Sequence, residues 1–244
     1  MDLKDKVAIV TGGAVRLGAA ITRELAESGV NVMCHFYSSQ QAATELKQGL
    51  GPHGTRVHLF QYDLMRPDAP KAIVTETLRV FSTIDVLINN AALFYRTPLG
   101  KVTENDWDTF HNLNLKSAFF LSQEVSQILL KKKQGKIINI GDAGAEAPFP
   151  GYIPYSLTKA GIMAMTKGLA KALAPHIQVN CINPGPVLFP EDMSDRDKNY
   201  ALEQTLLKRE GTDTDIARTV RFLLQDSDFI TGAVIPVDGG RQIR

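Results

Sequence analysis

The chain has 244 residues, of which 44% are hydrophobic and 22% are charged, which is the composition of a globular protein with a sizeable core. Its 27 basic and 26 acidic side chains leave a formal net charge of +1, so no basic excess points to nucleic acid or to an anionic membrane surface. Charges interrupt the first ten residues and no apolar run approaches about 18 residues, so we expect neither a signal peptide nor a membrane span. Cys34 and Cys181 lie in apolar runs, as buried thiols do, and we expect a cytoplasmic protein.

Short apolar runs alternate with longer amphipathic segments from one end of the chain to the other. In chain order we expect strand–helix pairs at 6–12 and 16–29, at 30–37 and 40–51, and at 56–64 and 67–81. A strand at 84–90 precedes two helical segments within 103–133, and a strand at 135–141 precedes a helix at 152–175. A strand at 177–185, a helix at 212–225 and a strand at 232–240 complete the pattern.

Strands that are apolar on both faces and separated by helices are typical of a parallel sheet. The pattern predicts an α/β fold with one Rossmann-type, doubly wound parallel sheet of about seven strands and helices on both faces. We expect residues 1–244 to form a single dinucleotide-binding and catalytic domain. Residues 186–210 are the least regular stretch, with prolines and charges beside a strand end, and we expect them to form a substrate lid.

The first functional motif is "TGGAVRLG", which follows the first strand and opens the first helix. Glycines at this place let the backbone approach a pyrophosphate, and the positive end of the helix favours its charge. A tight turn after a strand also favours glycine, but the position within a strand–helix–strand unit indicates a dinucleotide site. The residues expected to contact the cofactor here are Thr11, Gly12, Arg16, Leu17 and Gly18.

The end of the second strand indicates which dinucleotide binds. A cofactor without a 2′-phosphate is often held by a carboxylate about 20 residues beyond the loop. Here the sequence reads "HFYSSQ" and has no carboxylate, while two serine hydroxyls and the nearby Arg16 could bind a phosphate. The alternative is a plain polar turn; we predict NADPH as the cofactor, in contact with His35, Tyr37, Ser38 and Ser39.

The segment "INNAALF" ends the fourth strand, at the edge where ligands bind in open α/β sheets. We expect Asn90 and Ala91 to line the cofactor site. Phe94 is either a core residue or an aromatic ring on which a planar substrate stacks.

Tyr155 and Lys159 lie four residues apart and share one face of a helix. An ammonium group one turn away favours the phenolate, so we expect Lys159 to lower the pKa of Tyr155 and make it a proton donor near neutrality. A tyrosine and a lysine at this spacing are common on helices. Together with the phosphate loop, Asn114 and Asp142, however, they indicate an acid–base centre.

These motifs together resemble the short-chain dehydrogenase/reductase superfamily over residues 4–240. The resemblance implies that Asp63 contacts the adenine, with Leu64 beside it, and that Asn114 holds a water that relays protons to Lys159. It also implies that Pro184 and Gly185 lie beside the nicotinamide and that the subunits form a homotetramer. No metal site is predicted.

Three departures from the usual superfamily pattern resemble pteridine reductases: Arg16 in the glycine loop, Phe94 after the "NNA" motif, and Asp142 where a serine is usual. In that subgroup the arginine touches cofactor and pterin, the phenylalanine stacks on the pterin, and the aspartate acts with the tyrosine. The resemblance thus implies that Arg16, Phe94, Asp142 and Tyr155 contact a pterin or folate-like substrate.

Electrostatics supports an imine-type substrate independently. A ketone that accepts hydride gains negative charge on oxygen, and a carboxylate about 4 Å away opposes it by about 4 kcal/mol at intermediate screening. A ring C=N nitrogen gains a proton instead, which Asp142 favours. The alternatives are a carbonyl reductase, such as a reductase of 3-oxoacyl thioesters or sugars, and a non-catalytic regulator that senses dinucleotides.

Overall fold

The computed structural model of the chain describes residues 1–51, 57–146, 148–189 and 193–243. Within them one parallel sheet has the strand order β3-β2-β1-β4-β5-β6-β7. The order reverses beside β1, so the prediction of a doubly wound sheet of seven strands is confirmed. The strands are β1 (Val7–Val10), β2 (Asn31–Phe36), β3 (Val57–Gln61), β4 (Val86–Asn89), β5 (Gly135–Ile140), β6 (Ile177–Pro184) and β7 (Val234–Val237).

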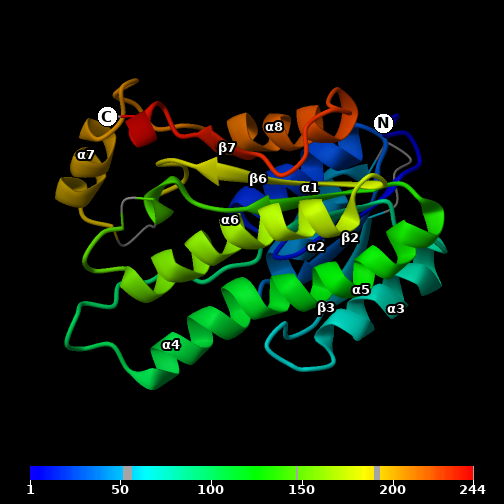
Figure 1. Ribbon diagram of the computed structural model, residues 1–244, viewed down its shortest axis with the longest axis horizontal. Helices are drawn as coiled ribbons and strands as arrows, with labels where there is room; N and C mark the ends of the chain where they lie inside the picture. The colour runs from blue at the N-terminus through cyan, green and yellow to red at the C-terminus, as the bar shows by residue number, and fades with distance from the viewer. Residues whose placement is uncertain (52–56, 147, 190–192, 244) are drawn as a thin grey trace.

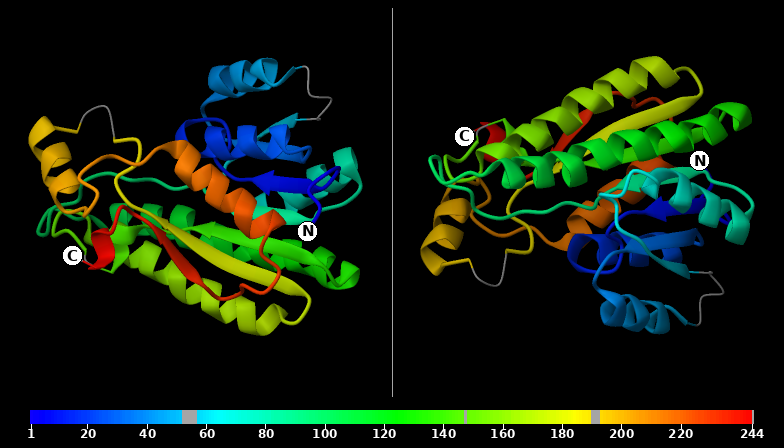
Figure 2. Two further views of the ribbon diagram at one scale, coloured as in Figure 1. Left: turned by 90° about the horizontal axis from the view of Figure 1, so that it is seen from above. Right: turned by 90° about the horizontal axis from the view of Figure 1, so that it is seen from below.

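Helices cover both faces of the sheet (Figures 1 and 2). One hydrophobic core joins the sheet to α1 (Arg16–Glu27), α2 (Gln40–Gly49) and α8 (Asp213–Gln225). A second core joins the opposite face to α3 (Ala69–Phe81), α5 (Ser117–Lys132) and α6 (Ile153–Leu173).

The first strand shows why its apolar residues produce this arrangement. All four residues of β1 are buried, and successive side chains point to opposite faces. Ala8 and Val10 belong to the core with α1, whereas Val7 and Ile9 belong to the core with α3 and α5. A strand covered on both sides must be apolar at every position, which explains why its sequence does not alternate with polar residues.

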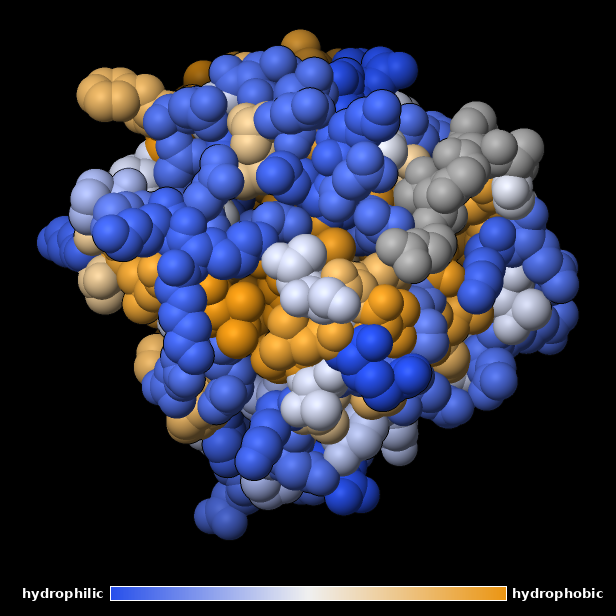
Figure 3. All heavy atoms as spheres, turned by 90° about the vertical axis from the view of Figure 1, so that its right-hand side faces the viewer, coloured by the Kyte–Doolittle hydropathy of each residue, from blue (hydrophilic) through white to orange (hydrophobic). Residues whose placement is uncertain are grey.

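Because the strands are parallel, their carboxyl ends meet at one edge of the sheet. Figure 1 shows α7 (Asp195–Glu203) and the C-terminal end of the chain together at this end of the molecule. The opposite end, where the strands begin, presents mainly hydrophilic side chains around an apolar band (Figure 3).

Two regions differ from the expected pattern. The segment predicted as two helices within 103–133 is α4 (Glu104–Phe110) and α5, joined by the π-helical segment η2 (His111–Lys116).

The stretch 186–210, expected to be irregular, contains α7, whose N-cap Ser194 accepts a hydrogen bond of 3.2 Å from the backbone N–H of Asp197. Residues 190–192 of that stretch, and residue 56 of the expected third strand, lie outside the described residues. A lid role for 186–210 stays a prediction.

Among the described residues, no helix is both long and apolar enough to cross a membrane.

Candidate active site

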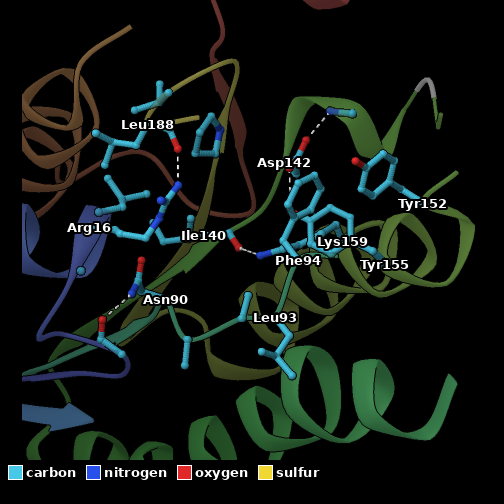
Figure 4. A pocket seen from close by; sticks show the side chains of 18 of the residues that line it. Arg16, Asn90, Leu93, Phe94, Ile140, Asp142, Tyr152, Tyr155, Lys159 and Leu188 are labelled. Atoms are coloured by element: carbon cyan, nitrogen blue, oxygen red, sulfur yellow. Dashed lines mark hydrogen bonds between the residues drawn. The ribbon is translucent and has the colours of Figure 1, made fainter. Parts of the chain in front are cut away.

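A cavity of about 1100 Å³ lies at the carboxyl edge of the sheet and extends to the turns before α6 and into α7 (Figure 4). It brings together residues that are up to 229 positions apart in the chain, from Gly12 to Arg241. The predicted site residues that line it are Gly12, Arg16, Leu17, Gly18, His35, Tyr37, Ser38, Ser39, Asp63, Leu64, Asn90, Ala91, Phe94, Asp142, Tyr155, Lys159, Pro184 and Gly185.

Two predicted site residues do not reach the wall of this cavity. The Thr11 hydroxyl is buried and accepts hydrogen bonds of 3.0 Å from the backbone N–H groups of Asn90 and Ala91. Asn114, in η2, pairs with the backbone of Leu93, accepting from its N–H at 2.8 Å and donating to its carbonyl at 3.0 Å. Both side chains therefore position residues at the exit of β4, and the proposed water relay through Asn114 stays a prediction.

The loop between β1 and α1 depends on two glycines. Gly12 has a φ of +60°, which glycine adopts without strain. A Cβ at Gly18 would lie 1.9 Å from the Gly12 carbonyl oxygen, so a side chain does not fit there. Asn90 fixes the loop by donating from Nδ2 to the carbonyls of Thr11 (2.9 Å) and Gly12 (3.1 Å).

Arg16 opens α1 with a φ of +51°, an unusual conformation for a residue with a side chain. Its guanidinium donates a hydrogen bond to the carbonyl of Leu188, in the segment that follows β6 (Figure 4). This contact joins the start of α1 to the segment after β6, and Arg16, Pro184 and Gly185 all line the cavity.

His35 connects the glycine loop to the third strand. Its Nδ1 accepts a hydrogen bond of 3.3 Å from the N–H of Gly12, so Nε2 carries the proton and donates to the Tyr62 carbonyl at 3.0 Å. Burial lowers the pKa of His35 to about 4, and the ring is neutral at pH 7.

Two serines line the far end of the cavity from the Tyr–Lys pair. Ser38 is exposed, and Ser39 is the N-cap of α2, although its side chain makes no capping hydrogen bond. Both hydroxyls therefore lie at the positive end of a helix, a place that favours a phosphate. Asp63 follows β3 on the same wall and accepts a hydrogen bond of 2.9 Å from the Met65 N–H.

Asp142, Tyr155 and Lys159 meet at the other end of the cavity. Asp142 caps the short 3-10 helix η3 (Ala143–Ala145): Oδ1 accepts from the Gly144 N–H at 2.6 Å, while Oδ2 accepts from the Tyr155 hydroxyl at 2.7 Å. The Lys159 ammonium donates to the Ile140 carbonyl at 2.8 Å, and Nζ lies 5.8 Å from the centroid of the Tyr155 ring.

This arrangement corrects the predicted effect of Lys159 on the phenol. Burial, followed by the charge and hydrogen bond of Asp142, raises the pKa of Tyr155 well above its usual value. Burial also lowers the pKa of Lys159, against the attraction of Asp142. Desolvation and the adjacent carboxylate dominate, so Tyr155 is a protonated donor at neutral pH rather than a phenolate.

Phe94 is a cavity residue rather than a core residue, because 43% of its surface is exposed and it lines the cavity. Its ring is parallel to that of Tyr152, with centroids 4.7 Å apart and an interplanar angle of 1°. The Tyr155 ring approaches it edge-on, at 4.8 Å and 76° (Figure 4). A flat aromatic surface therefore lies beside the proton donor.

Sequence reasoning missed several residues of the cavity wall. Tyr152 precedes Tyr155 by three positions, a spacing that places both on one side of a helix start and could have indicated it. No local signal identified Phe149, in the turn before α6, or Arg241, near the end of the chain.

The chain is similar to known proteins over nearly its whole length. A family model described as "Enoyl-(Acyl carrier protein) reductase" matches residues 13–242. The 3-oxoacyl-[acyl-carrier-protein] reductase FabG of Staphylococcus epidermidis is 36% identical over 240 residues, covering 97% of this chain and 98% of that protein. The (2S)-[(R)-hydroxy(phenyl)methyl]succinyl-CoA dehydrogenase subunit BbsD of Thauera aromatica is 33% identical and covers 100% of this chain and 99% of its own length.

Two solved structures have the same architecture over nearly the whole chain. A blue fluorescent protein from a metagenomic library, in complex with NADPH, has a TM-score of 0.92 at 34% identity and covers 99% of both chains. A mutant short-chain dehydrogenase/reductase of Serratia marcescens has a TM-score of 0.91 at 30% identity and covers 99% of this chain and 100% of that one. From the matched family model, the relatives and the shared fold we conclude that this chain belongs to the short-chain dehydrogenase/reductase superfamily of oxidoreductases.

Proposed function

We propose that this chain is an NADPH-dependent reductase of a pterin or a closely related flat heterocycle, acting on a ring C=N bond. The observation that carries the proposal is the 2.7 Å hydrogen bond between the Tyr155 hydroxyl and Asp142, beside the exposed ring of Phe94. A carboxylate that shares the proton of the catalytic phenol suits a substrate nitrogen that must gain a proton.

The residues at the other end of the cavity fit NADPH. The glycine loop leaves no room for side chains next to Asn90, which lets a pyrophosphate approach the backbone. The hydroxyls of Ser38 and Ser39, at the start of α2, suit a 2′-phosphate, and positions 35–40 carry no carboxylate to repel it. The NADPH in the similar blue fluorescent protein supports the same choice.

In the proposed reaction, reduced nicotinamide supplies a hydride to the ring carbon of the C=N bond. Tyr155 gives its proton to the adjacent ring nitrogen, and Asp142 accepts a hydrogen bond from the phenol before the transfer. Lys159, fixed by the Ile140 carbonyl, holds a positive charge near the phenolate that forms. Phe94, which is 43% exposed and whose ring is supported by the stacked Tyr152 ring, orients the flat ring by stacking.

A second candidate is a reductase of 3-oxoacyl thioesters, supported by the names of the FabG relatives and of the matching family model. Asp142 opposes this candidate, because a carboxylate hydrogen-bonded to the proton donor Tyr155 would repel an oxyanion that formed beside that donor. The expected homotetramer, cytoplasmic location and single-domain organisation stay predictions.

Loss of reduced-nicotinamide absorbance distinguishes the two candidates. Purified protein and NADPH are mixed in turn with dihydrobiopterin, dihydrofolate and an acetoacetyl thioester. We expect turnover of at least one pterin at a kcat/KM at least about 100-fold above that for the thioester, since one acid–base contribution is of that size. Turnover of the thioester alone would establish the second candidate instead.

A further inference from the structure

Two arginines line the same cavity without a role in the reaction above. Arg96 lies in the segment after β4, and Arg241 begins the short 3-10 helix η4 (Arg241–Ile243) at the end of the chain. Arg96 is exposed and Arg241 is half-buried. Two guanidiniums that are 145 positions apart in the chain therefore line the same cavity as the stacking and proton-donating residues.

The backbone places Arg96 on the same side as the stacking ring. Residues 94–96 lie in a segment without helix or strand bonds, and Tyr95 turns away from the cavity. The Tyr95 ring stacks on buried Phe110 at 4.4 Å, and its hydroxyl donates to Asp106 at 3.0 Å. Phe94 and Arg96 both line the cavity whereas Tyr95 does not, so Arg96 continues the wall that Phe94 begins.

Arg241 reaches the same region through an aromatic contact. Its guanidinium carbon lies 4.7 Å from the centroid of the Phe149 ring. The Phe149 carbonyl accepts a hydrogen bond of 3.0 Å from the Tyr152 N–H, and Tyr152 is the residue stacked on Phe94. The turn from Phe149 to Tyr152 therefore contacts Arg241 at its first residue and Phe94 at its last.

The same turn also contacts Arg96. The Thr97 N–H donates to the Gly151 carbonyl at 2.7 Å, and a Cβ at Gly151 would lie 3.2 Å from the Nε of Arg96. Arg96 and Arg241 therefore flank the turn formed by residues 149–151, next to the place where a flat ring would stack.

The charge of this region is unbalanced. Within the parts of the chain that the structure describes, neither Arg96 nor Arg241 lies within ion-pair distance of a carboxylate. Asp142 and Asp197 also line the cavity, but their carboxylates accept hydrogen bonds from the hydroxyls of Tyr155 (2.7 Å) and Ser194 (2.9 Å). Two guanidiniums to which the described residues offer no carboxylate partner are well suited to carboxylate or phosphate oxygens.

We propose that Arg96 and Arg241 bind an anionic group on the side chain of the substrate, so that the preferred substrate is a flat heterocycle with a carboxylate or phosphate tail. This inference rests on the proposed function and narrows its substrate class. The ring stacks on Phe94, and the tail extends along the turn of residues 149–151 toward the two guanidiniums.

The test compares matched substrates that differ only in tail charge. Dihydroneopterin is compared with its monophosphate, and dihydrofolate with its dimethyl ester, by steady-state kinetics with NADPH at low salt. We expect the anionic member of at least one pair to have a kcat/KM about tenfold or more above its neutral partner, mainly through KM. The pair with the larger ratio identifies phosphate or carboxylate as the tail. In 1 M salt, where the Debye length is about 3 Å, the ratio should shrink.

Variants connect the preference to the two arginines. Arg96→Gln and Arg241→Gln should each reduce the anionic-to-neutral ratio about threefold or more, and the double variant should bring it close to one. Arg196→Gln is the matched control, because Arg196 is exposed on α7 but does not line the cavity, and it should keep the ratio. Melting curves exclude variants that fail to fold.

The outcomes separate the inference from the function on which it rests. If all four compounds are reduced with equal kcat/KM, the proposed function stands and the inference is wrong. An anionic preference that survives the double variant also overturns it. If none of the pterins is reduced, the proposed function fails and the inference falls with it.

Discussion

The hydroxyl of Tyr155, in the first turn of α6, donates a 2.7 Å hydrogen bond to Oδ2 of Asp142, which caps η3. Because burial and the carboxylate both raise the pKa of Tyr155, the phenol keeps its proton at neutral pH. This proton lies between the Tyr155 oxygen and the Asp142 carboxylate, and both residues line the cavity. If activity is lost as the pH rises from neutrality to about 10, that loss is therefore caused by the titration of a group other than this phenol.

Replacement of the carboxylate tests its part in the reaction. We expect Asp142→Ser to lower pterin turnover by roughly 100-fold or more, the size of a lost acid–base contribution. NADPH binding, measured by fluorescence titration, should not change, since the substitution leaves the glycine loop and residues 35–40 untouched. Asp197→Ser is a matched control, because this carboxylate lines the cavity but pairs with Ser194. Equal pterin turnover in Asp142→Ser and the parent would remove Asp142 from the mechanism.

Cofactor preference should depend on the serines before α2. We expect the parent to have a higher kcat/KM with NADPH than with NADH, and Ser38→Asp to reverse much of that preference by repelling the 2′-phosphate. Gln40→Asp adds the same charge two residues later, outside the cavity wall, and should leave the preference in place. Equal use of both cofactors by the parent would contradict the prediction.

Loss of the stacking ring should weaken substrate binding. For Phe94→Ala we expect a loss of about 1–3 kcal/mol in pterin binding, the scale of base–aromatic stacking, measured as a rise in KM. NADPH affinity should change little. A lowered melting temperature with an unchanged KM would show that Phe94 acts only through its packing on Tyr152.

The sequence predicted those parts of the fold and site that depend on local pattern. The fully apolar β1, the glycine loop and the Tyr155–Lys159 spacing identified the parallel sheet and the cavity. The stacking of Tyr152 on Phe94 was not predictable, because it depends on a turn that packs against a distant loop. The direction of the Tyr155 pKa was predicted wrongly, since spacing reveals a neighbouring charge but not the extent of burial.

The buried histidine should make stability sensitive to acid. Burial lowers the pKa of His35 from 6.5 to about 4, so between these values the unfolded chain binds a proton that the folded chain does not. The free energy of unfolding should therefore fall by up to about 3 kcal/mol as the pH drops from 6.5 to 4. Urea unfolding at several pH values measures how the free energy of unfolding depends on pH. This dependence should be weaker in His35→Asn than in the parent, whereas replacement of the exposed His176 should leave it unchanged.

Two glycines should respond oppositely to alanine. Gly18→Ala places a methyl group 1.9 Å from the Gly12 carbonyl, so we expect a lower melting temperature and weaker NADPH binding. Gly168, in the interior of α6, has no atom within 4 Å of the corresponding position, so Gly168→Ala should stabilise the fold by about 0.5–1 kcal/mol. Equal melting temperatures for the two variants would show that the loop relaxes around the added methyl group.

The π-helical segment η2 sets the rotational phase between α4 and α5. A π-turn contains one residue more than an α-turn, so the two helices present faces that differ by about 100° from those of a continuous α-helix. Removal of one residue from 111–116 would restore α-helical phase and rotate α4 by that angle relative to α5. Asn114 would then turn away from Leu93, and the chain leaving β4 would lose its two hydrogen bonds to that side chain. The position of the segment that follows β4, which lines the cavity, is thus determined partly by the number of residues in a helix and not only by their identity.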